Sequence, residues 1–172
     1  ADDVIGTLAK AGEEAGWNVV ISTGDKDMAQ LVSERITLVN TMKNETLDIE
    51  GVKHKFGVRP DQIIDYLALM GDKVDNVPGV EKCGPKTAVK WLESYDSLQG
   101  VMAHADEIKG KVGENLQAAL ARLPLSYELV TIKTDVDLHG ELPEGLHSLH
   151  RQSPKWSQLA VEFKRLNFRT WL

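Results

Sequence analysis

The 172-residue chain has a single cysteine, no long hydrophobic run and no basic-then-apolar leader of secretory type. One thiol, Cys83, excludes an internal disulfide and any zinc site that needs several cysteines. A membrane helix needs roughly 18 or more consecutive apolar residues, which this sequence does not contain. We therefore expect a globular protein, for which the cytoplasm is the default location.

Several familiar catalytic motifs are missing as well. The five histidines have no partners at metal-ligand spacing, and no serine lies in a nucleophile-elbow motif. The glycine-rich stretch near residue 80 lacks the Gly-Lys-Ser/Thr ending of a P-loop. These absences leave clusters of carboxylates as the main candidates for chemistry.

The net charge of −6 argues by itself against a nucleic-acid partner. That argument is weak, because carboxylates gathered to hold divalent cations also count as negative charges. Bound cations reverse the local field around such a cluster.

The order of elements predicts an α/β fold. Residues 1–16 read as a helix that ends at a glycine, and 17–22 and 35–40 read as buried strands around a short helix at 28–32. This alternation predicts parallel pairing through a right-handed crossover. The chain opens on a helix with neither an initiator methionine nor a leading strand, which indicates a fragment of a longer protein.

The remainder of the sequence is mainly helical. Residues 48–57 and 59–71 read as two helices, and the pattern from 72 to 130 is helical throughout with short glycine and proline breaks. A loop-like stretch precedes an amphipathic helix at 155–166. We predict an α/β core over residues 1–71 and a helical subdomain over 72–172, with the four tryptophans as core anchors.

Acidic pairs occur at the helix start, after the first strand and ahead of the glycine-rich stretch. Hard divalent cations prefer oxygen ligands, and a two-cation site draws acids from several elements. Each pair also has a plain structural interpretation as a helix cap or a turn with Asx hydrogen bonds. The pairs are Asp2 with Asp3, Asp25 with Asp27, and Asp72 with Asp75.

The stretch "VPGVEKCGPKTAVKWL" has the pattern of a helix–hairpin–helix. Pro78 and Gly79 form the turn, Val80 fills the interior and Pro85 starts the second helix. Amides and lysines at that helix N-terminus are suited to phosphate, without reading bases. A turn with solvated lysines is the alternative. The candidate DNA-binding residues are Gly79, Val80, Lys82, Gly84, Lys86 and Thr87.

Four segments together resemble the 5′-nuclease domain of bacterial DNA polymerase I, in the flap endonuclease superfamily: "ADDVIGTLA", "VVISTGDKDMAQLV", "DYLALMGDKVDNVPGV" and "GPKTAVKWL". The resemblance covers residues 1 to about 138, and "FKRLNFRTWL" is similar to the end of that domain. It implies a PIN-like parallel-sheet core followed by a SAM-like helical subdomain. It also implies a bacterial, nucleoid-associated enzyme that cleaves 5′ flaps and nicked ends in replication and repair.

The resemblance further implies a site with two Mg²⁺ or Mn²⁺ ions, and a K⁺ ion at the hairpin. All six aspartates would be catalytic, and all except Asp3 would ligate metal. Partners would be duplex and flapped DNA, RNA–DNA primer junctions and a polymerase domain of the same parent chain. The family's glutamate ahead of Ala1 and its N-terminal metal-binding aspartates are absent, so the first-metal ligands are incomplete and we expect the fragment to bind duplex but to cleave little. Lys82 stands where many relatives have glycine.

Two rival functions come from the same residues. One is a helix–hairpin–helix module that binds duplex DNA without catalysis, its acids serving as caps. The other is a Mg²⁺-dependent phosphatase built around "DKD", which leaves the hairpin unexplained.

Overall fold

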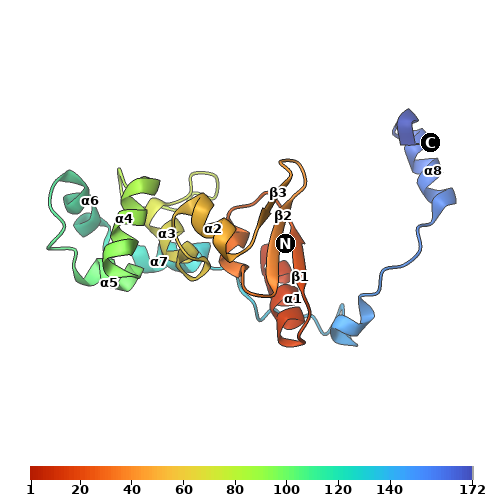
Figure 1. The fold of residues 1–172 in the computed structure, drawn as a ribbon, viewed down its shortest axis with the longest axis horizontal. Coiled ribbons are helices and arrows are strands. Elements are labelled where there is room, and N and C mark those ends of the chain that lie inside the picture. Colours follow the sequence, from red (N-terminus) through yellow and green to blue (C-terminus); the bar gives the residue numbers. More distant parts are fainter. Residues whose placement is uncertain (172) are drawn as a thin grey trace. The chain divides into compact units, whose positions relative to one another are not determined.

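The computed structural model describes residues 1–171 and divides into two compact units, Ala1–Val136 and Asp137–Leu172. The first unit contains the sheet and most helices (Figure 1), and the second contains a single α-helix with short 3₁₀ turns. None of the helices within residues 1–171 is long and apolar enough to cross a membrane.

A small mixed sheet forms one part of the first unit, in the order β1-β2-β3. The strands are β1 (Val19–Ser22), β2 (Ile36–Asn40) and β3 (Glu45–Leu47). The predicted parallel pair is present, with Val19 opposite Ile36. The sequence reading missed β3, which pairs antiparallel with β2 through Asn40 and Glu45. It is only three residues long, too short for an alternating pattern to show.

Helix α1 (Asp2–Glu14) packs on β1, and its buried face is built from small residues, Gly6, Ala9 and Gly12. A Cβ atom on Gly12 would come within 2.9 Å of the Val19 side chain, so glycine permits the close approach. The segment after β1 forms the 3₁₀ turn η1 (Asp27–Leu31). These contacts fix the ends of β1 and η1 relative to α1.

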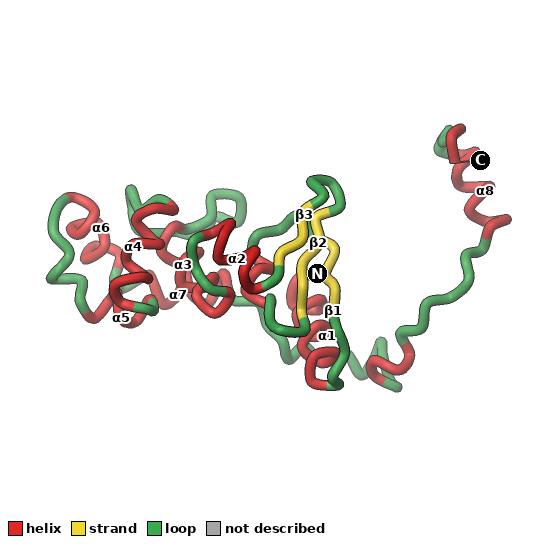
Figure 2. The backbone as a smooth tube through the Cα atoms, in the orientation of Figure 1, coloured by secondary structure: helices red, strands yellow, loops and turns green. Residues whose placement is uncertain are grey.

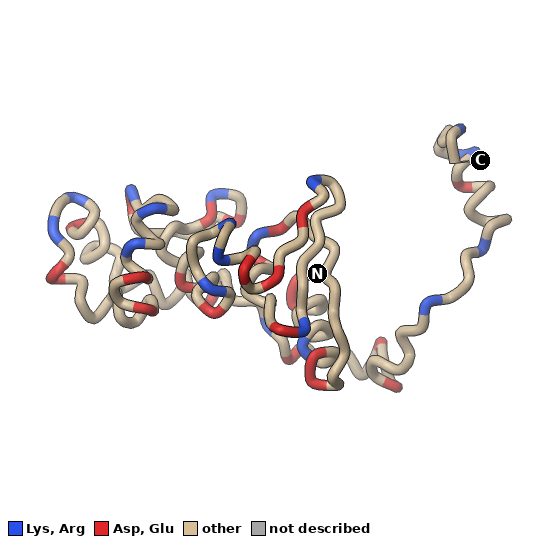
Figure 3. Tube along the Cα trace, viewed as in Figure 1, with Lys and Arg blue, Asp and Glu red and all other residues tan. Residues whose placement is uncertain are grey.

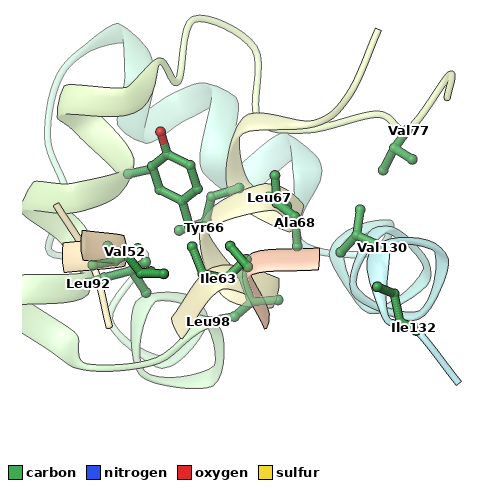
Figure 4. Packing of buried hydrophobic residues seen from close by; sticks show 14 of the residues in the cluster. Val52, Ile63, Tyr66, Leu67, Ala68, Val77, Leu92, Leu98, Val130 and Ile132 are labelled. Atoms are coloured by element: carbon green, nitrogen blue, oxygen red, sulfur yellow. The ribbon is translucent and has the colours of Figure 1, made fainter. Parts of the chain in front are cut away.

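The helical part of the first unit is organised around α3 (Ile63–Met70), which follows α2 (Ile49–Phe56) and the turn η2 (Pro60–Gln62). Ile63, Leu67 and Leu69 on α3 are almost wholly buried. Figure 4 shows α3 side chains packed near Leu92 and Leu98. Helix α3 contacts α4 (Pro85–Tyr95), α5 (Leu98–Ala103) and α7 (Leu123–Val130). Helix α6 (Lys111–Ala119) lies between α5 and α7 in the chain.

Helix α3 contacts η1 as well as α4 and α7. The α/β part and the helical part therefore share one hydrophobic core, which contains both Ile36 of β2 and Leu116 of α6. The boundary predicted at residue 71 stays a prediction. Figure 2 shows how small the strand content is beside the helices and loops.

Residues 71–84 are not helical, so the break in the helical pattern predicted from 72 to 130 is longer than the short glycine and proline breaks expected. Asp72 and Val77 exchange backbone hydrogen bonds of 3.0 and 2.7 Å, closing a turn between α3 and the hairpin. Gly71, at φ +73°, ends α3, because a left-handed residue cannot continue a helix. The glycines and prolines of residues 71–84 therefore interrupt the helical structure that continues on both sides.

The second unit contains η3 (Gly145–Ser148), α8 (Trp156–Arg165) and η4 (Arg169–Trp171). Helix α8 confirms the amphipathic helix expected at 155–166. Only Trp91, at 5% exposure, is a core anchor, whereas Trp17, Trp156 and Trp171 are exposed, so the prediction for these three was wrong.

Candidate metal centre and nucleic-acid interface

The turn after β1 positions Asp27. Thr23 Oγ1 accepts the backbone N–H of Asp25 at 3.0 Å, and the Asp25 carboxylate accepts the N–H of Asp27 at the same distance. Asp25 thus acts as an Asx-type acceptor that shapes the turn. Asp27 follows at the first position of η1, half-buried.

The turn after α3 positions Asp72 and Asp75. Oδ1 of Asp72 accepts backbone N–H groups from Val74 at 2.7 Å and Asp75 at 3.3 Å. Asp72 is 6% exposed, whereas Asp75 is exposed. The segment is a turn, and the Asx interpretation describes the hydrogen bonding of Asp72.

These two turns bring three carboxylates together. Asp27, Asp72 and Asp75 each offer an oxygen within 4.8 Å of the others. Lys26 Nζ donates to Oδ2 of Asp72 and forms an ion pair with it. One ammonium therefore lies against an acidic cluster drawn from two distant segments.

The cluster shifts the protonation of its own members. Burial raises the pKa of Asp27 to about 6, the Asp25 charge adds to the rise and the Lys26 charge opposes it. The hydrogen bond from Lys26 holds the pKa of Asp72 below its ordinary value, and the same bond raises the pKa of Lys26. A cation bound beside Asp27 would therefore offset the burial and the negative charge of Asp25 that disfavour its ionised form.

Asp2 and Asp3 face the same cleft as Asp27 and Asp75. This cleft, of about 220 Å³, is also lined by Val77 and by residues 129–132. Figure 4 shows Val77, Val130 and Ile132 at one side of the core. Asp3 has a further role in this arrangement, because its Oδ1 accepts the backbone N–H of Lys133 at 2.9 Å.

Asp25 lines a different and smaller cavity, together with Asn40 and Glu45. It nevertheless stays close enough for its charge to raise the pKa of Asp27. Five of the six predicted acids therefore lie in the cluster or along its cleft, and Asp25 supports the turn that carries Asp27.

The donor set fits a divalent cation. Oδ1 of Asp27 is buried and has no hydrogen-bond partner within residues 1–171, which is costly unless something pairs with it. Carboxylate oxygens from several elements are what Mg²⁺ or Mn²⁺ prefers.

Two residues at this site were missed by the sequence reading. A role for Lys26, between the two acids of "DKD", was not predicted, because a lysine in an exposed turn is usually solvated. Gln30 hydrogen-bonds to Val130 and Ile132, and no local pattern reveals contacts with residues about 100 positions away.

The hairpin is held against two helices. Its Val80 N–H donates to the Leu69 carbonyl of α3 at 2.8 Å, and Arg122 donates to the Gly79 carbonyl at 3.0 Å. The Ser126 hydroxyl of α7 donates to the Pro78 carbonyl. These bonds orient the turn from both sides.

The other hairpin residues divide into buried and exposed groups. Val80 and Cys83 are buried, as the sequence predicts for packing residues, whereas Lys82 and Lys86 are exposed. Gly84 precedes α4, and Thr87 is half-buried in its first turn. Figure 3 shows Lys and Arg interspersed with Asp and Glu along the whole backbone, so basic residues are not confined to the hairpin.

Two family models match the chain. Residues 1–57 match the 5′-3′ exonuclease N-terminal resolvase-like domain, and residues 58–155 match the 5′-3′ exonuclease C-terminal SAM fold. The first match covers the sheet with α1 and α2, and the second covers the helical part.

The chain is 49% identical over 184 residues to DNA polymerase I of Pseudomonas aeruginosa, covering 100% of this chain and 19% of that protein. It is 41% identical over 172 residues to a 5′-3′ exonuclease of Aquifex aeolicus, covering 100% of this chain and 57% of the relative. The chain thus spans about a fifth of the first relative and a little over half of the second.

Solved structures share the fold. Phage T5 5′-exonuclease with bound zinc ions matches with a TM-score of 0.71 at 22% identity, over 77% of this chain and 50% of that one. T5 D15 flap endonuclease, in a complex with DNA and metal ions, matches with the same TM-score at 21% identity and the same coverage. At such identities the likeness concerns the fold, and it confirms the predicted α/β core with a SAM-type helical part.

Proposed function

Because the chain belongs to the 5′-3′ exonuclease family, we propose that it contributes a divalent-metal site and a duplex-binding hairpin to a nuclease acting on DNA 5′ ends. The observation that carries this proposal is the convergence of Asp27, Asp72 and Asp75 within 4.8 Å. Their segments are separated by more than 40 residues of sequence, so the convergence is a product of the fold.

We assign the carboxylates distinct tasks. Asp27, Asp72 and Asp75 hold Mg²⁺ or Mn²⁺, and Asp2 extends the metal site from α1 along the shared cleft. Asp25 holds the Asp27 turn and adds negative charge beside it. Asp3 ties α1 to residue 133 and thereby keeps Asp2 on the cleft.

When bound, the cations supply Lewis acidity toward a phosphodiester. The chain's own contribution is positional. Buried Asp72 is rigid because two backbone N–H groups hold its Oδ1, and η1 fixes the backbone of Asp27. Holding acids in place before substrate arrives avoids reorganisation during reaction.

The hairpin supplies the second half of the proposal. The hairpin offers hydrogen-bond donors to the phosphate backbone of one DNA strand and makes no base contacts. These donors are the side chains of Lys82 and Lys86 and the first backbone amides of α4. We further propose that backbone carbonyls of residues 79–84 hold a K⁺ ion. The substrates would be flapped and nicked duplexes, including RNA–DNA primer junctions, encountered at the nucleoid in the cytoplasm.

We also propose that the chain acts as one region of a longer polymerase I, beside its polymerase domain. Alone it should retain salt-sensitive duplex binding and show little cleavage. Robust Mg²⁺-dependent cleavage of a flap substrate by the isolated chain would overturn this part.

The test uses Asp75→Asn, because Asp75 is exposed and its change should leave folding intact. We expect Mn²⁺ binding, measured by titration calorimetry, to weaken about tenfold or more while duplex binding stays unchanged. Asp106→Asn, on an exposed aspartate distant in sequence, is the control.

The rival proposal is a duplex-binding module without catalysis, favoured by the Asx-turn roles of Asp25 and Asp72. Asp25→Ala in the full-length protein separates the two. Loss of cleavage with duplex binding intact supports the nuclease, whereas unchanged cleavage supports the module.

A further inference from the structure

In the sequence Lys26 lies between Asp25 and Asp27, and it forms its ion pair with Asp72 of the acidic cluster. Its Nζ donates to Oδ2 of Asp72, whose side chain is only 5% exposed while that of Lys26 is 42% exposed. The negative charges of Asp72, Asp27 and Asp25 all raise its pKa, in that order of size. The ammonium is therefore attracted by acids of both turns, with Asp72 as its hydrogen-bond partner.

The two oxygens of Asp72 are used differently. Oδ1 accepts the backbone N–H groups of Val74 and Asp75, so the turn itself satisfies it. Oδ2 is paired with the Lys26 ammonium. A buried carboxylate without a partner costs several kcal/mol in general, so this pairing stabilises the chain when no cation is bound.

We propose that Lys26 is a positioning residue that acts as a built-in counter-cation: it holds Asp72 in the metal-free chain and competes with a divalent cation for Asp72 Oδ2. This inference rests on the proposed metal function of the cluster. The two cations compete because the Lys26 ammonium and a divalent metal ion repel each other when both contact Asp72 Oδ2.

Two opposite consequences distinguish this role from a merely structural one. Without the ammonium, the metal-free chain is less stable, because Asp27, Asp72 and Asp75 repel one another uncompensated. The same change makes the site more negative and strengthens its attraction for divalent ions. If Lys26 only stabilised the fold, its removal would lower both the stability of the chain and its affinity for divalent ions.

The experiment compares the wild-type chain with Lys26→Met, which keeps an unbranched side chain and removes the charge. Lys53→Met is the matched control, because Lys53 pairs with exposed Glu50 on α2. Mn²⁺ affinity is measured by electron paramagnetic resonance of the free ion, and Tm is measured in EDTA and in saturating Mn²⁺.

We expect Lys26→Met to bind Mn²⁺ about tenfold more tightly than wild type and to have a lower Tm in EDTA, with the Tm difference narrowing in Mn²⁺. Lys26→Arg, which retains the charge, should restore the weaker affinity. Lys53→Met should match wild type in affinity.

Equal or weaker Mn²⁺ binding by Lys26→Met, with clear binding by wild type, would overturn the Lys26 role and leave the metal proposal standing. Absence of Mn²⁺ binding in every protein would overturn both. Binding by Lys26→Met alone would support the counter-cation role in its strongest form.

Discussion

Ile132 donates its backbone N–H to the side-chain carbonyl of Gln30 at 2.9 Å, across 102 positions of sequence. The amide nitrogen of the same side chain donates to the Val130 carbonyl, also at 2.9 Å. The Gln30 carboxamide therefore links residues 130–132 to η1, the element that begins at Asp27. Because this segment lines the acidic cleft, Gln30 holds part of the wall of that cleft in position.

Replacing Gln30 by Met should remove both bonds and leave an N–H and a carbonyl unpaired. We expect the free energy of unfolding to fall by about 1–3 kcal/mol, measured by urea denaturation. Gln30→Glu keeps the acceptor for Ile132 and should lose less. Gln117→Met, which breaks one 3.3 Å bond to Ala105, is the control, and equal losses in all three variants would contradict the clamp.

Gly79→Ala should displace the hairpin. A Cβ atom at Gly79 would lie 2.2 Å from the Met70 carbonyl carbon and 2.3 Å from the Gly71 nitrogen, and backbone atoms cannot move aside cheaply. We expect duplex affinity, measured by fluorescence anisotropy, to fall about tenfold. Gly140→Ala meets no atom within 4 Å and should bind normally. Normal binding by Gly79→Ala would show that the hairpin does not contact the duplex.

Lys82→Gly should separate stability from binding. Lys82 has a φ of +64°, which costs a residue with a side chain about 1 kcal/mol relative to glycine. We therefore expect a higher Tm together with weaker duplex binding. The salt dependence of log K should become shallower by about 0.9 if one phosphate contact is lost. An unchanged slope would mean that this ammonium touches no phosphate.

Asp65 predicts a pH dependence of stability. It is 6% exposed, and burial raises its pKa to about 6, with the Leu98 N–H opposing and the charges of Asp61 and Asp96 adding. The folded chain thus binds this proton more tightly than the unfolded chain, so stability from this group is present at low pH. It is lost as pH rises from the ordinary value of 3.8 through about 6.

Asp65→Asn keeps an acceptor for Leu98 and removes the charge. Relative to wild type, it should gain up to about 3 kcal/mol of unfolding free energy at pH 8 and little at pH 4. Thermal melts across that range test this, with Asp61→Asn as an exposed neighbour for comparison. A gain that is equal at both pH values would contradict an ionised, buried Asp65.

The elements that local pattern predicted well are those whose signals lie within a few residues. The β-branched run at Val19–Ser22, the proline that starts α4 and the apolar stripe of α3 all formed as expected. For residues 72–77 the sequence left helix and Asx turn open, because the flanks are helical, and the pairing of Asp72 with Val77 shows the turn. Three tryptophans were wrongly predicted to be buried, because a large aromatic side chain is not by itself evidence of burial.

By itself the sequence determined most helices, the parallel strand pair, the six candidate acids and the hairpin, since capping, turn and periodicity signals act over a few residues. Only the tertiary structure decided which acids meet. It placed Asp27 beside Asp72 and Asp75, turned the Asp25 carboxylate toward the backbone N–H of Asp27 and set Lys26 against Asp72 Oδ2. Such pairings depend on the packing of α3 against η1, which joins residues far apart in sequence and leaves no local trace.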